Sequence, residues 1–346
     1  MADLVIADSD RDALVAAGLV LSTLEDTVTF RVVASLQDAT RLLHDARRSY
    51  VRVYVCGVSA ADSGSLRSVL TVLQARGTRV LWFDSHDFLW TTAVRTQLDQ
   101  LDVQYRLPEP HRPETERTSG IVLAHLLDSG DPAAMGRERD LRGAVSQARG
   151  TELGGPDWIA LVDAVEHDHR LVANRAIRAA IQRVWDPGCA LSSQEGRLLS
   201  LQRSREARLN RFLERLSGEQ EYGQELLRFD AEAHRELRYI RPRVYLEAAR
   251  RRLGAEHAMA RVERGWFHAG RDPHRPGLDL PVALMDKLFD LDVAIHGYPY
   301  RATVQVQGGA DVDQRIWKAL EIALEEERSG RRRSAAFPEL EDNIDW

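Results

Sequence analysis

The segment LVIADSDRDAL (residues 4–14) places three aspartates at alternate positions, where an apolar run ends and a helical pattern begins. Alternate residues of an extended chain point the same way, so Asp8, Asp10 and Asp12 can converge beside the positive end of the following helix. Such a cluster suits a hard divalent cation or a phosphate. The alternative is structural, because Asp10 or Asp12 could simply cap that helix. Three aspartates directly after a strand favour a ligand site.

Composition indicates an ordinary soluble protein. The 346 residues are enough for two domains, and 44% of them are hydrophobic and 29% charged. No run of about 18 apolar residues occurs, and the N-terminus lacks an export signal, so we expect a cytoplasmic protein with no membrane span. Cys56 and Cys189 fit no Cys-x-x-Cys pattern, which favours reduced, buried thiols.

Charge is unevenly distributed along the chain. The net charge is −6, but residues 190–275 hold 18 arginines against 13 acidic residues, so basic charge is concentrated in the middle. Glu and Arg at helical spacing usually mark a solvated helix face, which favours helices that bridge two domains. The alternative is a nucleic-acid groove, because arginine suits phosphate. Its candidate binding residues are Arg203, Arg205, Arg208 and Arg211.

The first 110 residues alternate strand-like and helix-like segments. Apolar runs rich in β-branched residues predict strands at 4–7, 30–34, 51–57, 80–84 and 103–107. Apolar residues at helical spacing predict helices at 12–24, 36–47, 63–75 and 91–100. This alternation predicts an α/β fold, with a mostly parallel sheet and helices on both faces. Ligands of such sheets collect at the carboxyl ends of the strands, where the aspartate cluster falls.

The rest of the chain changes character twice. Helices are expected at 119–127 and 157–168, and residues 192–252 have an almost wholly helical pattern. A glycine- and proline-rich stretch then leads to a helix at 282–289, a strand pair at 291–296 and 301–307, and a closing helix at 312–327. The expected parts are an α/β domain at 1–190, a helical bridge at 191–264, a small α+β domain at 265–330 and a disordered tail at 331–346.

This order of segments resembles the DHH phosphoesterase superfamily over nearly the whole chain. That family includes RecJ-type exonucleases, oligoribonucleases and manganese pyrophosphatases, and it opens with a His-x-Asp-x-Asp-Gly motif that holds two manganese ions. Asp10 and Asp12 match the two aspartates, Ala13 takes the small-residue position, and Asp8 stands in place of the histidine. A carboxylate can also ligate manganese. The resemblance therefore implies that Asp8, Asp10 and Asp12 are metal ligands.

The later motifs depart further from the family pattern. Gly57 stands where the family has an aspartate that bridges the two metals, and it offers no ligand. The Asp-His-His motif is Asp84-Ser85-His86 here, so a metal-binding histidine is lost while His86 matches the one that contacts phosphate. The fourth motif, an aspartate after a helix, has candidates at residues 166–169, of which Asp168 is the predicted ligand. The Gly-Gly-His loop of the family is absent.

Two-metal phosphoryl chemistry needs a bridging ligand between ions about 3.5–4 Å apart, so a complete dinuclear site is not expected. The remaining ligands could hold a single manganese or magnesium ion, or none if the site is fully degenerate. Clustered carboxylates repel each other when no cation is present. Either a metal therefore neutralises them, or basic residues such as Arg11 and Arg79 do so.

The resemblance implies two candidate functions. In the first, the chain is a degenerate relative that acts as a structural or binding subunit in nucleic-acid processing, as inactive, helicase-associated relatives do. In the second, it is an active manganese- or magnesium-dependent phosphodiesterase or nuclease on single-stranded nucleic acid, oligonucleotides or a nucleotide signal. Asp10, Asp12 and His86 would then be its catalytic residues. The expected partners are further copies of the chain, or a complex that includes an ATP-driven motor protein.

Overall fold

The computed structural model describes residues 2–24, 28–33, 36–44, 50–59, 63–86, 90–148, 155–167, 173–219, 223, 225–272, 277–298, 300–306 and 309–336. The chain divides into two compact units, Met1–Ala207 and Arg208–Trp346. Helix α10, Ser193–Glu219, contains the point of division. Each unit has a sheet of its own.

Five parallel strands form the sheet of the first unit, in the order β2-β1-β3-β4-β5. Their bounds are β1 Ala2–Asp8, β2 Thr29–Val33, β3 Tyr50–Cys56, β4 Arg79–Phe83 and β5 Gln104–Arg106. One helix connects each strand to the next, and these helices are α1 Arg11–Thr23, α2 Leu36–His44, α3 Ser63–Ala75 and α4 Thr92–Gln100. The predicted α/β fold with a parallel sheet is confirmed.

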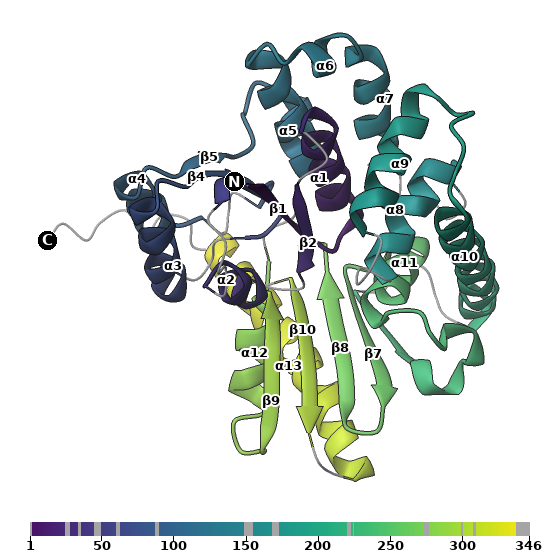
Figure 1. Ribbon diagram of the computed structural model, residues 1–346. Helices are drawn as coiled ribbons and strands as arrows, with labels where there is room; N and C mark the ends of the chain where they lie inside the picture. The colour runs from purple at the N-terminus through teal and green to yellow at the C-terminus, as the bar shows by residue number, and fades with distance from the viewer. Residues whose placement is uncertain are drawn as a thin grey trace, which may run out of the picture. The chain divides into compact units, whose positions relative to one another are not determined.

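Both faces of this sheet are buried by helices (Figure 1). Leu4 and Ile6 of β1 pack with side chains of α2, α3 and α4, whereas Val5 and Ala7 pack with α1 and the later helices. Alternate residues of a strand face opposite ways, so a strand buried on both faces is a continuous apolar run. The later helices are α5 Thr118–Asp128, α6 Pro132–Met135, α7 Glu138–Ala148, α8 Asp157–His167 and α9 Ala173–Trp185, with a 3₁₀ turn at Pro113–Glu116.

The second unit contains a mixed sheet in the order β6-β7-β8-β10-β9. Its strands are β6 Leu226–Asp230, β7 His257–Glu263, β8 Trp266–Arg271, β9 Val293–Tyr298 and β10 Arg301–Val306. Strands β6 and β7 are parallel and the other neighbours are antiparallel. The predicted pairing of β9 with β10 is therefore present.

Helices cover both faces of the second sheet (Figure 1). Helix α11, Pro242–Leu253, contacts β7 and β8 on one face. It begins with Pro242 and ends at Gly254, whose left-handed φ of +67° suits a helix C-terminus. On the other face, α12 Leu280–Lys287 and α13 Ala310–Ala336 bury a core with Met259 and Phe267. Two 3₁₀ turns, Ala231–Ala233 and Arg235–Leu237, follow β6.

The expected helical bridge at 191–264 is wrong where it includes β6 and β7, because both strands belong to the second sheet. Their sequences, LLRFD and HAMARVE, hold alanine and charged residues in place of the usual β-branched ones. Pairing with neighbouring strands outweighs such weak local preference. Cys56 is buried as expected, whereas Cys189 is only partly buried.

The end of the chain also differs from the expectation. Helix α13 continues to Ala336, so residues 331–336 are helical and are not part of a disordered tail. Residues 337–346 lie outside the described residues. In the part of the chain that the structure describes, no helix is both long and apolar enough to span a membrane.

Candidate functional site

The positions that resemble the first three family motifs lie at the carboxyl ends of three neighbouring strands. Asp8 is the last residue of β1, Gly57 follows β3, and Asp84 follows β4. Gly57 N–H donates to the Phe83 carbonyl at 2.8 Å, which joins the ends of β3 and β4. Asp8, Asp84 and His86 are 1%, 0% and 4% exposed, so this end of the sheet buries several ionisable groups.

Asp10 and Asp8 accept hydrogen bonds from the turn that follows β1. Asp10 is the N-cap of α1, and its side chain accepts from the Ala13 N–H at 2.8 Å. The capping alternative is therefore present at this position. Asp8 accepts from the backbone N–H of Ser9 and from its hydroxyl at 3.3 Å. Both carboxylates thus stabilise the local turn.

Asp12 performs a different structural role, because it caps a helix 106 residues further along the chain. Its carboxylate accepts from the Thr118 N–H at 2.7 Å, from the Ser119 N–H at 3.4 Å and from the Ser119 hydroxyl. Arg117, the local N-cap of α5, makes no capping hydrogen bond with its own side chain. The first N–H groups of a helix need acceptors and favour a negative charge. The Asp12 carboxylate supplies the acceptor and the negative charge at the start of α5.

Asp84 and His86 form a buried pair after β4. The Asp84 carboxylate accepts from His86 N–H at 3.1 Å, from His86 Nδ1 at 2.7 Å and from Trp90 Nε1 at 2.7 Å. Burial alone would raise the pKa of Asp84, but the charge and hydrogen bonds of His86, with the Trp90 hydrogen bond, outweigh burial and lower that pKa. This pair fixes the His86 ring through Nδ1.

His86 is also within electrostatic reach of the first aspartates. Burial alone would lower the pKa of His86, but Asp84, Asp10 and Asp8 outweigh burial and raise that pKa. The fold therefore places Asp8 and Asp10 within electrostatic reach of His86. It directs the Asp12 carboxylate to α5.

Substitution of Gly57 by a residue with a metal-binding side chain would strain the backbone. Its φ of +70° lies in the left-handed region, and a Cβ at this position would lie 2.5 Å from Cβ of Ala13 in α1. Ser85, at the other altered motif position, is buried, and its hydroxyl lies 3.2 Å from the Thr118 hydroxyl. The residues at both altered positions therefore fit the helices packed beside them: Gly57 leaves room for Ala13 of α1, and the Ser85 hydroxyl contacts Thr118 of α5.

Arg11 and Arg79 differ in their relation to the site. Arg11 donates from Nε and from its terminal nitrogen to both oxygens of Asp163 in α8, each at 2.7 Å. Arg79 stands at the first position of β4, at the opposite end of that strand, where it donates to Gln104 at 3.1 Å. The expectation that Arg79 neutralises the aspartates is therefore wrong. Asp163, 8% exposed, is a buried acid that the motif comparison missed.

The described residues do not fit a two-metal centre. Among the side chains that the structure describes, no group of three or more His, Cys, Asp or Glu residues is arranged to hold a metal ion. Asp168 lies outside the described residues, and so do His167 and Glu166 as side chains. Mn²⁺ and Mg²⁺ prefer several oxygen ligands around one ion. Here the Asp10 and Asp12 carboxylates accept hydrogen bonds from helix N–H groups.

The four arginines proposed for nucleic acid lie on α10 but in unequal environments. Arg203 donates to the Gly155 carbonyl at 2.7 Å and to Asp157 and Glu206, each at 2.8 Å. Arg208 donates to the Arg238 carbonyl at 3.2 Å, and Arg205 is half-buried. Arg211 is exposed. Arg203 thus anchors α10 to the start of α8, and binding of nucleic acid stays a prediction.

Comparison with known proteins gives matches to solved structures. No family model matches the chain, and no curated protein does so. RecJ from Thermus thermophilus in complex with Mn²⁺ is 13% identical, with a TM-score of 0.51 over 92% of this chain. The chain spans 52% of that protein's length.

Two further structures match over most of their own length. The DHH domain of a protein assigned to a family of ribosomal proteins is 14% identical, with a TM-score of 0.57 over 94% of this chain and 86% of that one. CDC45 from Entamoeba histolytica is 8% identical, with a TM-score of 0.51 over 93% of this chain and 95% of that one. With its parallel sheet, buried aspartates and second mixed sheet, the chain has the DHH/RecJ-like fold.

Proposed function

We propose that this protein is a non-hydrolysing DHH-type subunit that serves a structural or binding role in nucleic-acid processing. The observation that carries the proposal is the Asp12 carboxylate, which accepts hydrogen bonds from Thr118 and Ser119 at the start of α5. These hydrogen bonds engage one lone pair of Oδ2 and both lone pairs of Oδ1, so at most one lone pair of Asp12 is left for a metal ion. Ligation of a metal through both oxygens would break part of this cap, at a cost of about 0.5–2 kcal/mol.

The environment of Gly57 supports the same proposal. A bridging carboxylate fixes the spacing of two metal ions in phosphoryl transfer. Gly57 has no side chain, and Ala13 occupies the space that a Cβ would need. We propose that the cluster of Asp8, Asp10 and His86 now stabilises the end of the sheet, and that binding to other macromolecules remains its biological role.

The second candidate is an active phosphodiesterase or nuclease that uses one manganese or magnesium ion. It is favoured by the grouping of Asp8 and Asp10 near His86, and by the fold shared with a RecJ that was solved with Mn²⁺. In this alternative Asp168 would complete the ligands and His86 would hold the phosphate. The activity would require a water-activating base that no described residue supplies by its position.

A cleavage assay separates the two candidates. Purified protein is incubated with single-stranded DNA, RNA and dinucleotides in the presence of Mn²⁺ or Mg²⁺, beside Asp8→Asn and a control, Asp3→Asn. Asp3 pairs with Arg52 at the opposite end of β1, so its exchange tests general damage to the strand. We expect no metal-dependent cleavage by any of the three proteins. Cleavage that survives in Asp3→Asn and disappears in Asp8→Asn would establish the enzyme instead.

A binding assay tests the nucleic-acid role. The affinity for single-stranded DNA should fall steeply as salt rises, because bound cations are released from phosphates. Arg211→Ala should weaken binding, whereas Arg139→Ala, an exposed arginine on α7, serves as the matched control. Equal binding by both variants would remove α10 from the proposed surface. Sedimentation of the same protein tests the proposed self-association, and addition of a candidate ATP-driven motor protein tests complex formation.

A further inference from the structure

Tyr239 is an exposed aromatic residue with an unusual backbone conformation. The residue is 71% exposed, and its φ of +69° lies in the left-handed region that bulky side chains rarely adopt. It lies in a tight turn, because the Ile240 N–H donates to the Leu237 carbonyl at 2.9 Å. Arg238 has φ −57° and ψ +127°, the angles of the first central residue of a type II turn. Tyr239 therefore occupies the turn position that glycine normally takes.

The fold holds this turn in place and directs its centre to solvent. Leu237 and Ile240 are buried, whereas Arg238 and Tyr239 between them are exposed. Arg208 of α10 donates to the Arg238 carbonyl at 3.2 Å, which ties the turn to that helix. Strained conformations persist where the surrounding structure imposes them, and they cluster at binding sites. Because the exposed ring of Tyr239 adds little to the core, its presence in this turn points to binding.

Arginines of α10 lie along the same turn. Arg208, Arg211 and Arg215 are three and four residues apart and share one face of the helix. Arg208 contacts the Arg238 carbonyl and Arg215 pairs with Glu236, so this face lies along residues 236–238. Residues 208–215 and 235–243 together contain seven arginines and two glutamates, and all of them belong to the second unit. The turn therefore lies in a strongly basic part of that unit.

The ring and the guanidinium groups form one surface. The Arg238 guanidinium lies over the Tyr239 ring, 5.2 Å from its centroid, which is a cation–π arrangement. Arg211 and Arg235 are exposed as well. Exposed aromatic rings stack on the bases of single-stranded nucleic acid, and arginines bind its phosphates. In a duplex the bases already stack on each other, so the Tyr239 ring would gain no such contact.

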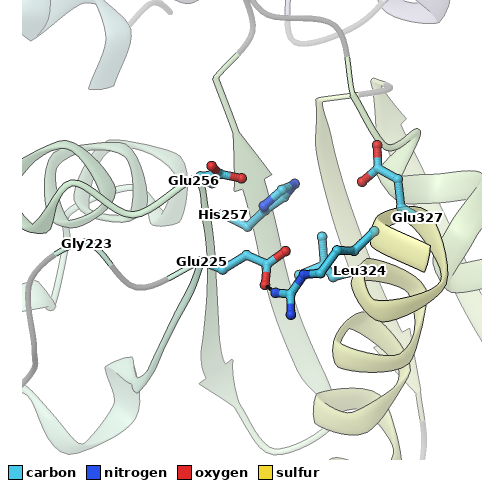
Figure 2. A pocket seen from close by; sticks show the side chains of 7 residues that line it. Gly223, Glu225, Glu256, His257, Leu324 and Glu327 are labelled. Atoms are coloured by element: carbon cyan, nitrogen blue, oxygen red, sulfur yellow. Dashed lines mark ion pairs between the residues drawn. The ribbon is translucent and has the colours of Figure 1, made fainter. Parts of the chain in front are cut away.

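A pocket elsewhere in the second unit does not suit the same ligand. It has a volume of about 340 Å³ and is lined by residues at the starts of β6 and β7 and on α13, as Figure 2 shows. Its lining contains Glu225, Glu256 and Glu327 together with Arg328, which pairs with Glu225. Three carboxylates oppose the approach of phosphate. The charge of the second unit therefore favours the turn around Tyr239 as the place for a polyanion.

We propose that single-stranded nucleic acid binds at this turn, where one base stacks on the Tyr239 ring and the flanking phosphates contact Arg211, Arg235 and Arg238. The inference rests on the proposed nucleic-acid role and assigns that role to residues of the second unit. Every base has a flat face that can stack on a ring, so the surface prefers single strands to duplexes and has little preference among sequences.

Fluorescence anisotropy of a labelled oligothymidylate with the whole protein tests the proposal. Tyr239→Ala should weaken binding about fivefold or more, because stacking of one base on an aromatic ring is worth at least about that factor. Tyr239→Phe keeps the ring and should bind within about twofold of the parent. Phe289→Ala is the matched control, since it removes another exposed ring of the second unit, 84% exposed, and should leave the affinity unchanged.

An abasic oligonucleotide of the same length separates stacking from charge. It keeps the phosphates and lacks the bases, so the parent should bind it more weakly than oligothymidylate. Tyr239→Ala should bind the two strands about equally. Arg211→Ala should weaken the binding of both strands, because its guanidinium contacts phosphate.

Tyr239→Gly separates loss of the ring from loss of the fold. Glycine adopts a left-handed φ without strain, so this variant should unfold at the same temperature as the parent or a higher one. Its affinity for oligothymidylate should nevertheless be as low as that of Tyr239→Ala. A variant with lower affinity and an intact fold assigns the loss to the missing ring.

The outcomes distinguish this inference from the function on which it rests. If the parent and Tyr239→Ala bind oligothymidylate equally, this surface is wrong while the nucleic-acid role stands. If the parent binds no nucleic acid, both are wrong. Equal affinity for a duplex of the same length would overturn the stacking role. Tighter, Tyr239-dependent binding of a polyglutamate peptide would assign the surface to an acidic protein partner and would also overturn the proposal.

Discussion

Asp12 in α1 accepts a hydrogen bond of 2.7 Å from the backbone N–H of Thr118, the first residue of α5. The two residues are 106 positions apart, so the contact is tertiary although it performs the work of a local helix cap. It ties α1 to α5 within the first unit. The motif that resembles a set of metal ligands is therefore also part of the packing between two helices.

Removal of the Asp12 carboxylate should destabilise the protein. Asp12→Ala leaves the first N–H groups of α5 without their acceptor, and we expect a loss of about 1–2 kcal/mol in the free energy of unfolding. Asp12→Asn keeps one acceptor oxygen and should lose less. Urea unfolding of the three proteins measures both differences. Full stability of Asp12→Ala would contradict the structural role assigned to this carboxylate.

Introduction of an acid at position 57 should lower the stability of the protein. Gly57→Asp would place a β-carbon 2.5 Å from Cβ of Ala13 at a φ of +70°, and we expect a loss of about 2–4 kcal/mol. Gly77 has the same φ of +70° and nothing within 4 Å of an added Cβ. Gly77→Asp therefore isolates the backbone strain, about 1 kcal/mol. Thermal unfolding should rank the parent above Gly77→Asp and Gly57→Asp last.

A compensating exchange distinguishes steric from backbone causes. If the contact with Ala13 causes most of the loss, adding Ala13→Gly to Gly57→Asp should raise the free energy of unfolding, although Ala13→Gly alone lowers it. Lack of any coupling between the two positions in a double-mutant cycle would assign the whole cost to the backbone conformation.

The paired Arg11 and Asp163 should be strongly coupled. Both oxygens of Asp163 accept from Arg11 at 2.7 Å, and the two side chains are 19% and 11% exposed. Arg11→Met leaves a buried carboxylate without this partner and should cost about 3 kcal/mol. Arg11→Met with Asp163→Leu should recover a large part of that loss, because no buried charge remains. Chemical unfolding of the two single variants and the double variant gives the coupling energy.

Stability should fall with acid below pH 6.5 because of His257. Burial lowers its pKa to about 4 in the folded chain, against 6.5 as the ordinary value. Between these two values the unfolded chain binds more protons, so the free energy of unfolding decreases as pH falls through this window and is unaffected above it. At pH 5 the buried His257 lowers the free energy of unfolding by about 2 kcal/mol.

The variant His257→Gln isolates this contribution. Its unfolding free energy should change about 2 kcal/mol less between pH 7 and pH 5 than that of the parent. The pKa of His268 is also lowered to about 4 by burial, so His268→Gln should reduce the acid sensitivity in the same direction. Unfolding curves at several pH values measure the effect. Identical pH profiles for the parent and His257→Gln would show that His257 is not buried in its neutral form.

Much of the first unit could be predicted from local sequence patterns. Strands such as β1 and β3 are continuous apolar runs because both faces of a parallel sheet are buried, and this pattern is visible without a structure. The capping role of Asp10 was one of two predicted alternatives, since the acceptor and the Ala13 N–H are three residues apart.

The remaining features depend on contacts between distant residues. Nothing near Asp12 indicates that its partners are Thr118 and Ser119, and nothing near Asp163 indicates a pairing with Arg11. Strand β7 was missed because the strand has few β-branched residues and is stabilised by its neighbours β6 and β8. A buried acid facing a buried base leaves no periodic pattern in the chain, so such pairs require the fold to be known first.

The close approach of Gly57 to Ala13 also bears on how this chain can change over time. A single substitution toward an acid at position 57 meets the wall of α1, and the substitution that would make room, Ala13→Gly, itself costs about 1 kcal/mol of helix stability. Each step alone lowers the stability of the fold before the pair confers any benefit. Helix α1 therefore opposes the gain of an acidic side chain at position 57, because neither single substitution is favourable without the other.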